Sequence, residues 1–144
     1  MTSTSNQAAT VHRFYEQCLN QHQSGILPEI YTEDAILHTP NGERTGLAAI
    51  QETVDGVHAM FPDHHFKVED IIVSGDKAAA RWSMTATHTA PIRGIAPTGR
   101  PITQNAIVLY RFEGDRIAEQ WLQLDLAGVL RQIGVSIPGA PANR

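Results

Sequence analysis

The stretch KAAARWSMTATHT, residues 77–89, alternates between two kinds of side chain and predicts a long β-strand. One face of that strand would carry apolar side chains and a histidine: Ala78, Ala80, Trp82, Met84, Ala86 and His88. The opposite face would be mostly polar: Ala79, Arg81, Ser83, Thr85 and Thr87. A strand with one apolar and one polar face is typical of an antiparallel sheet that is covered on one side.

The segments on either side of this strand define the fold class. Further strands are predicted at residues 66–73, 102–112 and 117–124, with turn-forming residues between them. Earlier residues show helical periodicity instead, which predicts helices at 11–23, 26–31 and 45–61 around a brief strand at 35–38. Helices followed by a run of hairpin-linked strands indicate an α+β fold. Long antiparallel strands that face early helices predict a curved sheet around a cavity.

Length and composition describe one ordinary domain. The chain has 144 residues, and we expect a single domain at residues 6–135 between flexible tails at 1–5 and 136–144. One cysteine excludes a disulfide framework, and 11 basic against 15 acidic side chains disfavour a nucleic-acid partner. The N-terminal segment lacks the features of a signal peptide, and no apolar run approaches a membrane span. We therefore expect a cytoplasmic protein without a membrane partner.

Five motifs in chain order carry a resemblance to a known family. They are FPD at 61–63, TH at 87–88, GIAPTGR at 94–100, YRFEGDRI at 110–117 and DLAGVLRQIG at 125–134. Over about residues 8–134 the chain resembles the SnoaL-like polyketide cyclases, which have the nuclear transport factor 2-like fold. The resemblance implies a cone-shaped, mainly antiparallel sheet covered by N-terminal helices. It also implies a homodimer that pairs through the outer face of the sheet, where Arg81, Ser83, Thr85 and Thr87 would meet the partner.

The resemblance leaves the chemistry open between three classes of function. In the cyclases an acidic residue on the last strand acts as general acid and base, but the matching position here is Leu122. Positions that carry polar partners in the cyclases match Ala106 and Val108. The first class is a cofactor-free enzyme, an isomerase or lyase of cyclase type, which transfers protons or holds an apolar substrate in a reactive conformation. The second class binds a hydrophobic small molecule without catalysis, and the third is an enzyme like epoxide hydrolase or ketosteroid isomerase, which needs a buried carboxylate.

The last strand offers two alternative faces to the cavity. Glu119, Trp121, Gln123 and Asp125 share one face, whereas Gln120, Leu122 and Leu124 share the other. If the polar face lines the cavity, Glu119 and Asp125 are candidate acid and base groups whose pKa values burial would raise. If the leucine face does, the cavity is nearly dry and suits binding or shape-driven cyclisation. Asp125 has a second interpretation as the N-cap of a short last helix.

Three histidines are the strongest candidates for the polar end of the cavity. His88 ends the apolar face of its strand, His58 lies on the apolar stripe of a helix, and His38 ends a strand. An imidazole is well suited to proton transfer near neutral pH, so we take His88 first and His58 second as catalytic candidates. We expect His38, together with Gln104 or Asn105, to bind the substrate beside them.

The remaining candidates would form an apolar, aromatic wall for the substrate: Tyr15, Trp82, Met84, Tyr110, Trp121 and Leu122. We expect no cofactor, because the glycine-containing segment at 94–100 lacks the spacing of a phosphate loop. We also expect no metal, since no His-x-His or HExxH motif occurs and the adjacent His64 and His65 would point to opposite faces of a strand. Cys18 lies on the apolar stripe of a predicted helix, and the sequence offers no obvious base near it, which disfavours a nucleophilic role.

Overall fold

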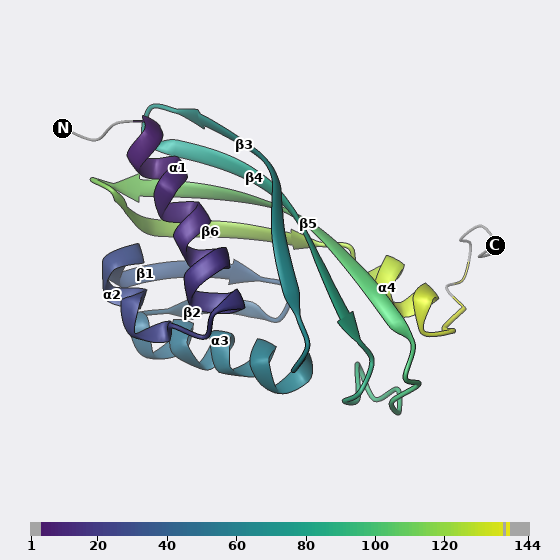
Figure 1. Ribbon diagram of the computed structural model, residues 1–144. Coiled ribbons are helices and arrows are strands. Elements are labelled where there is room, and N and C mark those ends of the chain that lie inside the picture. The colour runs from purple at the N-terminus through teal and green to yellow at the C-terminus, as the bar shows by residue number, and fades with distance from the viewer. Residues whose placement is uncertain (1–3, 137, 139–144) are drawn as a thin grey trace.

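The protein is described by a computed structural model that covers residues 4–136 and 138 (Figure 1). The first helix begins at Thr4, inside the stretch for which the sequence predicts a tail. Residues 1–3, 137 and 139–144 of the predicted tails lie outside the described residues. Among the described residues, no helix is long and apolar enough to cross a membrane.

The N-terminal helices supply one layer of the molecule. Helix α1 (Thr4–Arg13) continues as the π-helical segment η1 (Phe14–Asn20). Four side chains of η1 are buried: Phe14, Tyr15, Cys18 and Leu19. A short helical turn η2 (Ser24–Ile26) and helix α2 (Leu27–Ile30) follow. Helix α3 (Leu47–Met60) starts after Gly46, whose φ of 92° is readily adopted only by glycine, and it buries Ile50 and Val54.

Six strands form the second layer, in the order β2-β1-β6-β5-β4-β3. They are β1 (Tyr31–Thr39), β2 (Gly42–Thr45), β3 (His65–Ser74), β4 (Lys77–Thr87), β5 (Pro101–Glu113) and β6 (Arg116–Leu124). All neighbouring strands are antiparallel except β1 and β6, which run parallel. A last helix, α4 (Leu126–Gln132), packs near β5. The predicted α+β fold with a curved, mainly antiparallel sheet is confirmed, and the sheet curls without closing into a barrel (Figure 1).

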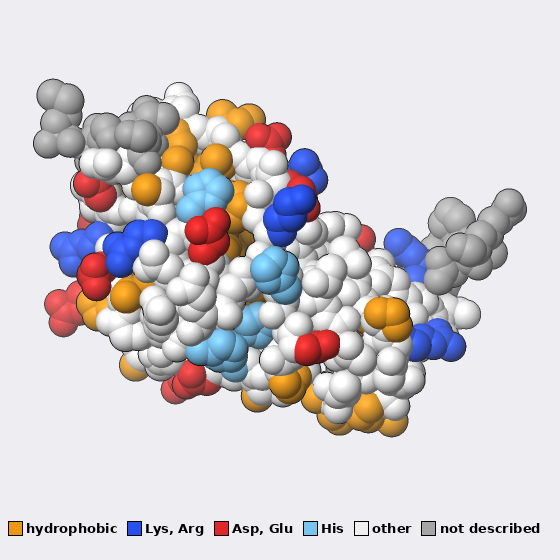
Figure 2. Space-filling model, viewed as in Figure 1, with side chains coloured by type: hydrophobic (Ala, Val, Ile, Leu, Met, Phe, Trp, Pro, Cys, Tyr) orange, Lys and Arg blue, Asp and Glu red, His pale blue; other side chains and the backbone are white. Residues whose placement is uncertain are grey.

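Strand register gives the sheet one buried and one outer face. Cross-strand neighbours such as Trp82 and Ala106, or Val108 and Leu122, lie on the face that the helices cover. The alternate residues form the outer face, where one apolar row crosses four strands: Ile72, Ala79, Leu109 and Trp121. Acidic and basic side chains are interspersed over the surface seen in Figure 2.

Strand β1 is longer than the sequence predicts. The expected strand covered residues 35–38, whereas β1 begins at Tyr31 and ends at Thr39. Its pairing with β6 shifts register between Tyr31 and Ile36, so the polar residues at 32–34 lie in an irregular stretch rather than in a regular ladder. A bulge of this kind hides a strand from a search for strict alternation.

Candidate active-site cavity

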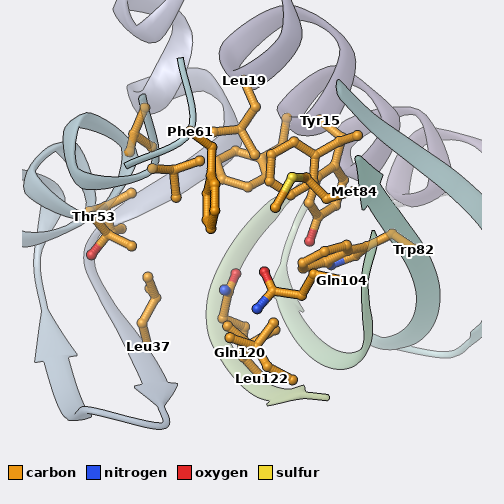
Figure 3. A pocket seen from close by; sticks show the side chains of 16 residues that line it. Tyr15, Leu19, Leu37, Thr53, Phe61, Trp82, Met84, Gln104, Gln120 and Leu122 are labelled. Carbon is orange, nitrogen blue, oxygen red and sulfur yellow. The ribbon is translucent and has the colours of Figure 1, made fainter. Parts of the chain in front are cut away.

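A cavity lies between the helices and the buried face of the sheet (Figure 3). Its wall comes from η1, α3 and the inner faces of β1 and β3–β6, and its volume is about 110 Å³. That space is comparable with the volume that a benzene-sized ring occupies in an apolar protein cavity. The cavity therefore suits one ring, or one ring-sized segment, of a small molecule.

Aromatic side chains form much of this wall. Phe66 meets Trp82 edge to face with ring centres 4.9 Å apart, and Tyr15 lies 5.8 Å from Trp82. Phe14 and Phe61 complete the aromatic set, and the other wall residues are aliphatic apart from Met84, Thr53 and two glutamines. A flat apolar molecule is the ligand that such a surface binds best.

Two glutamine amides provide most of the polarity inside the cavity. The Tyr31 hydroxyl donates a 2.7 Å hydrogen bond to Oε1 of Gln120, which leaves the amide nitrogen of Gln120 as a donor for a ligand. Gln104 is also buried, and its amide has no hydrogen bond to any of the described residues. Both amides point into the open space in Figure 3. The pair can hold a carbonyl or hydroxyl group of an otherwise apolar molecule.

Tyr15 in the cavity wall and Tyr110 behind it are neutral phenols. The Tyr15 and Tyr110 hydroxyl oxygens lie 2.5 Å apart in a hydrogen bond. Burial raises the pKa of Tyr15 and holds the pKa of Tyr110 well above its usual range. Burial likewise raises the pKa of the Cys18 thiol to about 11, so Cys18 is protonated at neutral pH and a poor nucleophile.

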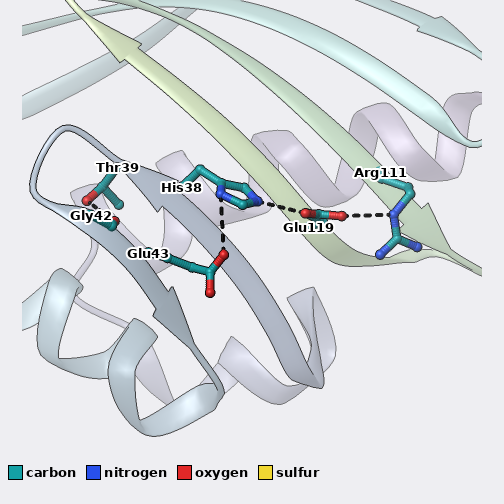
Figure 4. A network of polar contacts seen from close by, with 6 residues as sticks. All are labelled: His38, Thr39, Gly42, Glu43, Arg111 and Glu119. Carbon is teal, nitrogen blue, oxygen red and sulfur yellow. Dashed lines mark hydrogen bonds and ion pairs between the residues drawn. The ribbon is translucent and has the colours of Figure 1, made fainter.

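Glu119, Trp121 and Gln123 on the polar face of β6 are not in the cavity lining, and Glu119 instead joins the polar contacts drawn in Figure 4. Glu119 accepts hydrogen bonds from His38 Nε2 at 2.7 Å and from Arg111 Nε at 3.4 Å, and these partners lower the pKa of its carboxyl. Trp121 stacks on His38 with ring centres 5.3 Å apart. A general acid needs a raised pKa near its substrate. Glu119 has a lowered pKa on the opposite side of the sheet.

Asp125 serves as the N-cap of α4. Its side chain accepts a 2.9 Å hydrogen bond from the backbone N–H of Gly128, and a Cβ on Gly128 would collide with that carboxylate. The carbonyl of Asn105 accepts a hydrogen bond from the backbone N–H of Asp125 at 2.9 Å. The Asn105 side chain is exposed on the outer face. Both residues thus fix the end of the last strand and lie outside the cavity lining.

His88 anchors the loop between β4 and β5. Its side chain is fully buried, and Nδ1 accepts a 3.1 Å hydrogen bond from the backbone N–H of Thr98 and lies 2.9 Å from the Thr98 hydroxyl. The backbone N–H of His88 also donates to the carbonyl of Arg100 at 2.9 Å. These contacts tie the two ends of the loop together, away from the cavity lining.

His58 faces another histidine rather than the sheet. Its Nδ1 lies 2.8 Å from Nε2 of His64, and neither residue lines the cavity. The structure therefore does not bring His38, His58 and His88 together at one cavity. Helical periodicity placed His58 on the apolar stripe of α3, but periodicity does not show which distant residue a side chain meets.

Five of the predicted site residues line the cavity: Tyr15, Trp82, Met84, Gln104 and Leu122. Tyr110 lies behind Tyr15, outside the lining. Gln120 and Thr53 are polar wall residues that sequence reasoning did not select. Gln120 is the one whose amide can serve a ligand. The alternation pattern of the last strand could have indicated Gln120, because it places Gln120 on the same face as Leu122 and Leu124.

Comparisons with known proteins agree with the fold. The sequence profile of the family described as SnoaL-like polyketide cyclase matches residues 9–133. IdmH from Streptomyces antibioticus, a proposed polyketide cyclase, is 29% identical with a TM-score of 0.79, and the match covers 90% of this chain and 99% of IdmH. A proposed polyketide cyclase from Acidithiobacillus ferrooxidans is 26% identical with a TM-score of 0.81 over 92% of this chain and 97% of the relative.

A more distant structure shares the fold alone. AclR from Streptomyces galilaeus, a proposed hydroxylase, is 23% identical with a TM-score of 0.78, over 92% of this chain and 98% of AclR. Among curated proteins, none matches the chain. The related structures thus span more than one proposed chemistry on one architecture.

Proposed function

This chain belongs to the SnoaL-like polyketide cyclase family, and we propose that it promotes ring closure in an apolar, polyketide-like small molecule by holding it in a reactive conformation. The observation that carries the proposal is the cavity wall. It is apolar and aromatic, and its polar groups are two glutamine amides, one phenol, one threonine hydroxyl and the indole N–H of Trp82. Bringing two ends of one molecule together removes much of the barrier to an intramolecular reaction, so few catalytic groups are needed.

The glutamine amides would stabilise the charge that develops during the proposed ring closure. A carbonyl that gains negative charge during an aldol-type ring closure is stabilised by pre-oriented N–H donors in a dry site. Gln120 offers such a donor, because Tyr31 occupies its amide oxygen. Leu122, at the position of the cyclases' acidic residue, lines the cavity and adds apolar surface instead of a charge.

A second candidate function is binding without catalysis. Among the described residues that line the cavity, none is a carboxylate or an imidazole. This composition suits a carrier or accessory protein as well as a templating enzyme. It does not favour an epoxide hydrolase or ketosteroid isomerase type of enzyme, because Glu119 and Asp125 lie outside the lining.

Fluorescence of Trp82 tests the binding part of the proposal. The chain has two tryptophans, and replacing the outer one, Trp121→Phe, leaves Trp82 in the cavity wall as the only reporter. A hydroxylated naphthoquinone serves as the flat probe and should quench this fluorescence. Gln120→Leu should weaken binding about tenfold, the cost of one hydrogen bond. Gln123→Leu, the same change on the outer face of the same strand, should leave binding unchanged.

Turnover separates the two candidate functions. The purified chain is incubated with a linear aryl β-diketone that carries an aldehyde, and its intramolecular aldol product is followed by mass-resolved chromatography. Faster ring closure that falls in Gln120→Leu but not in Gln123→Leu supports the enzyme. Saturable binding with the uncatalysed rate supports the carrier, and absence of any binding excludes both.

We also propose that two copies pair through the outer face of the sheet. Ile72 and Ile107 are 67% and 58% exposed on this face, beside the polar side chains of β4. A contiguous apolar patch rimmed by polar side chains is typical of protein interfaces, and the outer row of Ile72, Ala79, Leu109 and Trp121 lies on the same face. Sedimentation at micromolar concentration should give a dimer mass that Ile107→Asp reduces to the monomer mass, whereas a wild-type monomer would refute the proposal.

A further inference from the structure

Three histidines from separate segments meet at one edge of the cavity wall. His22 follows η1, His58 lies in the last turn of α3, and His64 directly precedes β3. One ring nitrogen of each lies within 4.8 Å of the others, and His58 Nδ1 is 2.8 Å from His64 Nε2. Histidine side chains are visible on the face of the molecule shown in Figure 2.

The packing of these rings leaves polar atoms without partners. His22 stacks on His58 with ring centres 4.0 Å apart, and His58 and His64 are 4.9 Å apart. His64 is 92% buried, and its Nδ1 has no hydrogen-bond partner among the described residues; the same holds for Nε2 of His58. Buried polar atoms of this kind are uncommon, and an ion bound at the site is one explanation for them.

The backbone of His22 adopts an unusual conformation at the same place. Its φ is 57°, in the left-handed region that residues with a Cβ adopt at an energetic cost. This conformation sets the His22 ring against His58 at the protein surface. Three stacked imidazoles and a strained backbone therefore coincide at one point.

We propose that His22, His58 and His64 bind one divalent transition-metal ion, with Zn²⁺ as the preferred ion and water as the fourth ligand. Zn²⁺ bonds to imidazole nitrogen at about 2.0–2.1 Å, which requires ligand nitrogens about 3.4 Å apart in a tetrahedron. In the structure His58 Nδ1 and His64 Nε2 are 2.8 Å apart, and one ring nitrogen of each histidine lies within 4.8 Å of the others, so metal binding requires that the rings rotate from their stacked arrangement. Calcium and magnesium are disfavoured because they prefer oxygen ligands.

The position of the site indicates that a bound ion would stabilise the cavity wall. His64 meets Phe66 edge-on with ring centres 5.5 Å apart, and Phe66, Val57 and Phe61 line the cavity. A bound ion would join the segment after η1, the end of α3 and the start of β3. None of the three histidines is in the cavity lining, so the ion would hold the wall and would not touch the substrate.

Zinc binding by the full chain tests the proposal. The protein is treated with EDTA, dialysed and titrated calorimetrically with ZnSO₄, and its melting temperature is measured with and without the ion. We expect one equivalent to bind and to raise Tm. His22→Asn removes the exposed ligand and keeps a residue type that tolerates positive φ, and it should weaken binding by at least about 10–100-fold.

His65→Asn is the matched control, because His65 neighbours His64 in sequence and is not part of the cluster. Its zinc affinity and its Tm increase should equal those of the wild type. Cobalt provides a second measurement: intense visible absorption from tetrahedral Co²⁺ should appear in the wild type and in His65→Asn, and disappear in His22→Asn and His58→Gln. Absence of binding, or equal binding by the wild type and His22→Asn, would overturn the proposal and show a purely structural histidine stack.

Discussion

The hydroxyl of Tyr31 and the amide oxygen of Gln120 lie 2.7 Å apart, and this bond determines which end of the amide faces the cavity. Both side chains are buried, with 0% of Tyr31 and 6% of Gln120 exposed. An amide that is held at its oxygen presents N–H groups to a ligand. Tyr31 is therefore a positioning residue that acts on the cavity through Gln120.

Tyr31→Phe should weaken binding of the naphthoquinone probe about tenfold, because the Gln120 amide loses its fixed orientation. The same change should lower the free energy of unfolding by about 1–3 kcal/mol, since a buried acceptor loses its donor. Probe titration and urea denaturation measure the two effects. In a Gln120→Leu background Tyr31→Phe should have no further effect on affinity, and an undiminished effect there would contradict the positioning role.

The three tyrosines of the chain should make it sensitive to alkali. Tyr15, Tyr31 and Tyr110 are all buried, and burial raises the pKa of each above the ordinary value. Above about pH 10 the unfolded chain loses phenolic protons that the folded chain keeps, so stability falls as pH rises. Tyrosinate absorbance at high pH should appear only together with unfolding. A reversible tyrosinate signal from the folded protein at pH 10 would rule this out.

Glu119→Gln should leave probe binding and ring closure unchanged, because Glu119 lies on the outer face with His38 and Arg111. The free-energy effects of changes at sites without shared partners are usually additive to within about 0.5 kcal/mol, so the loss of this carboxylate should not alter the affinity for the probe. A substantial loss of turnover with intact binding would instead show that this carboxylate reaches the substrate.

His88→Ala should loosen the loop between β4 and β5. Removal of the imidazole takes away the acceptor for the Thr98 N–H, and we expect a loss of about 1–3 kcal/mol in the free energy of unfolding. Limited proteolysis should then cut within residues 89–99 faster than in the wild type. Affinity for the probe should stay within about twofold. A stable variant that binds the probe but has lost turnover would give His88 a catalytic role.

The regular strands of the sheet could be predicted from the sequence because side-chain alternation survives along them. β4 and β5 pair without interruption from Lys77 to Thr87, and their inner faces are the ones that alternation predicts. Which face of β6 lines the cavity was harder to predict. The pairing of β5 and β6 shifts register between Arg111 and Phe112, and a shift of this kind reverses the faces that follow it.

The contacts between the three histidines could not be predicted from the sequence, for a different reason. Local periodicity indicates which face of an element is apolar, but it says nothing about which residue of another element lies opposite. His58 meets His64 and His22 because a helix end, a strand start and a loop converge there. The resemblance to a known family did not help, since none of these residues belongs to the motifs that carry it.

The parallel pairing of β1 with β6 has a consequence for how the chain reaches its native state. His38 and Glu119 are 81 residues apart in sequence, yet they are hydrogen-bonded neighbours across these two strands. Contacts between distant segments form late, because a long loop must close first. The sheet can therefore be completed only after β6 has been synthesised, and we expect the apolar inner face to lack its full cover until then.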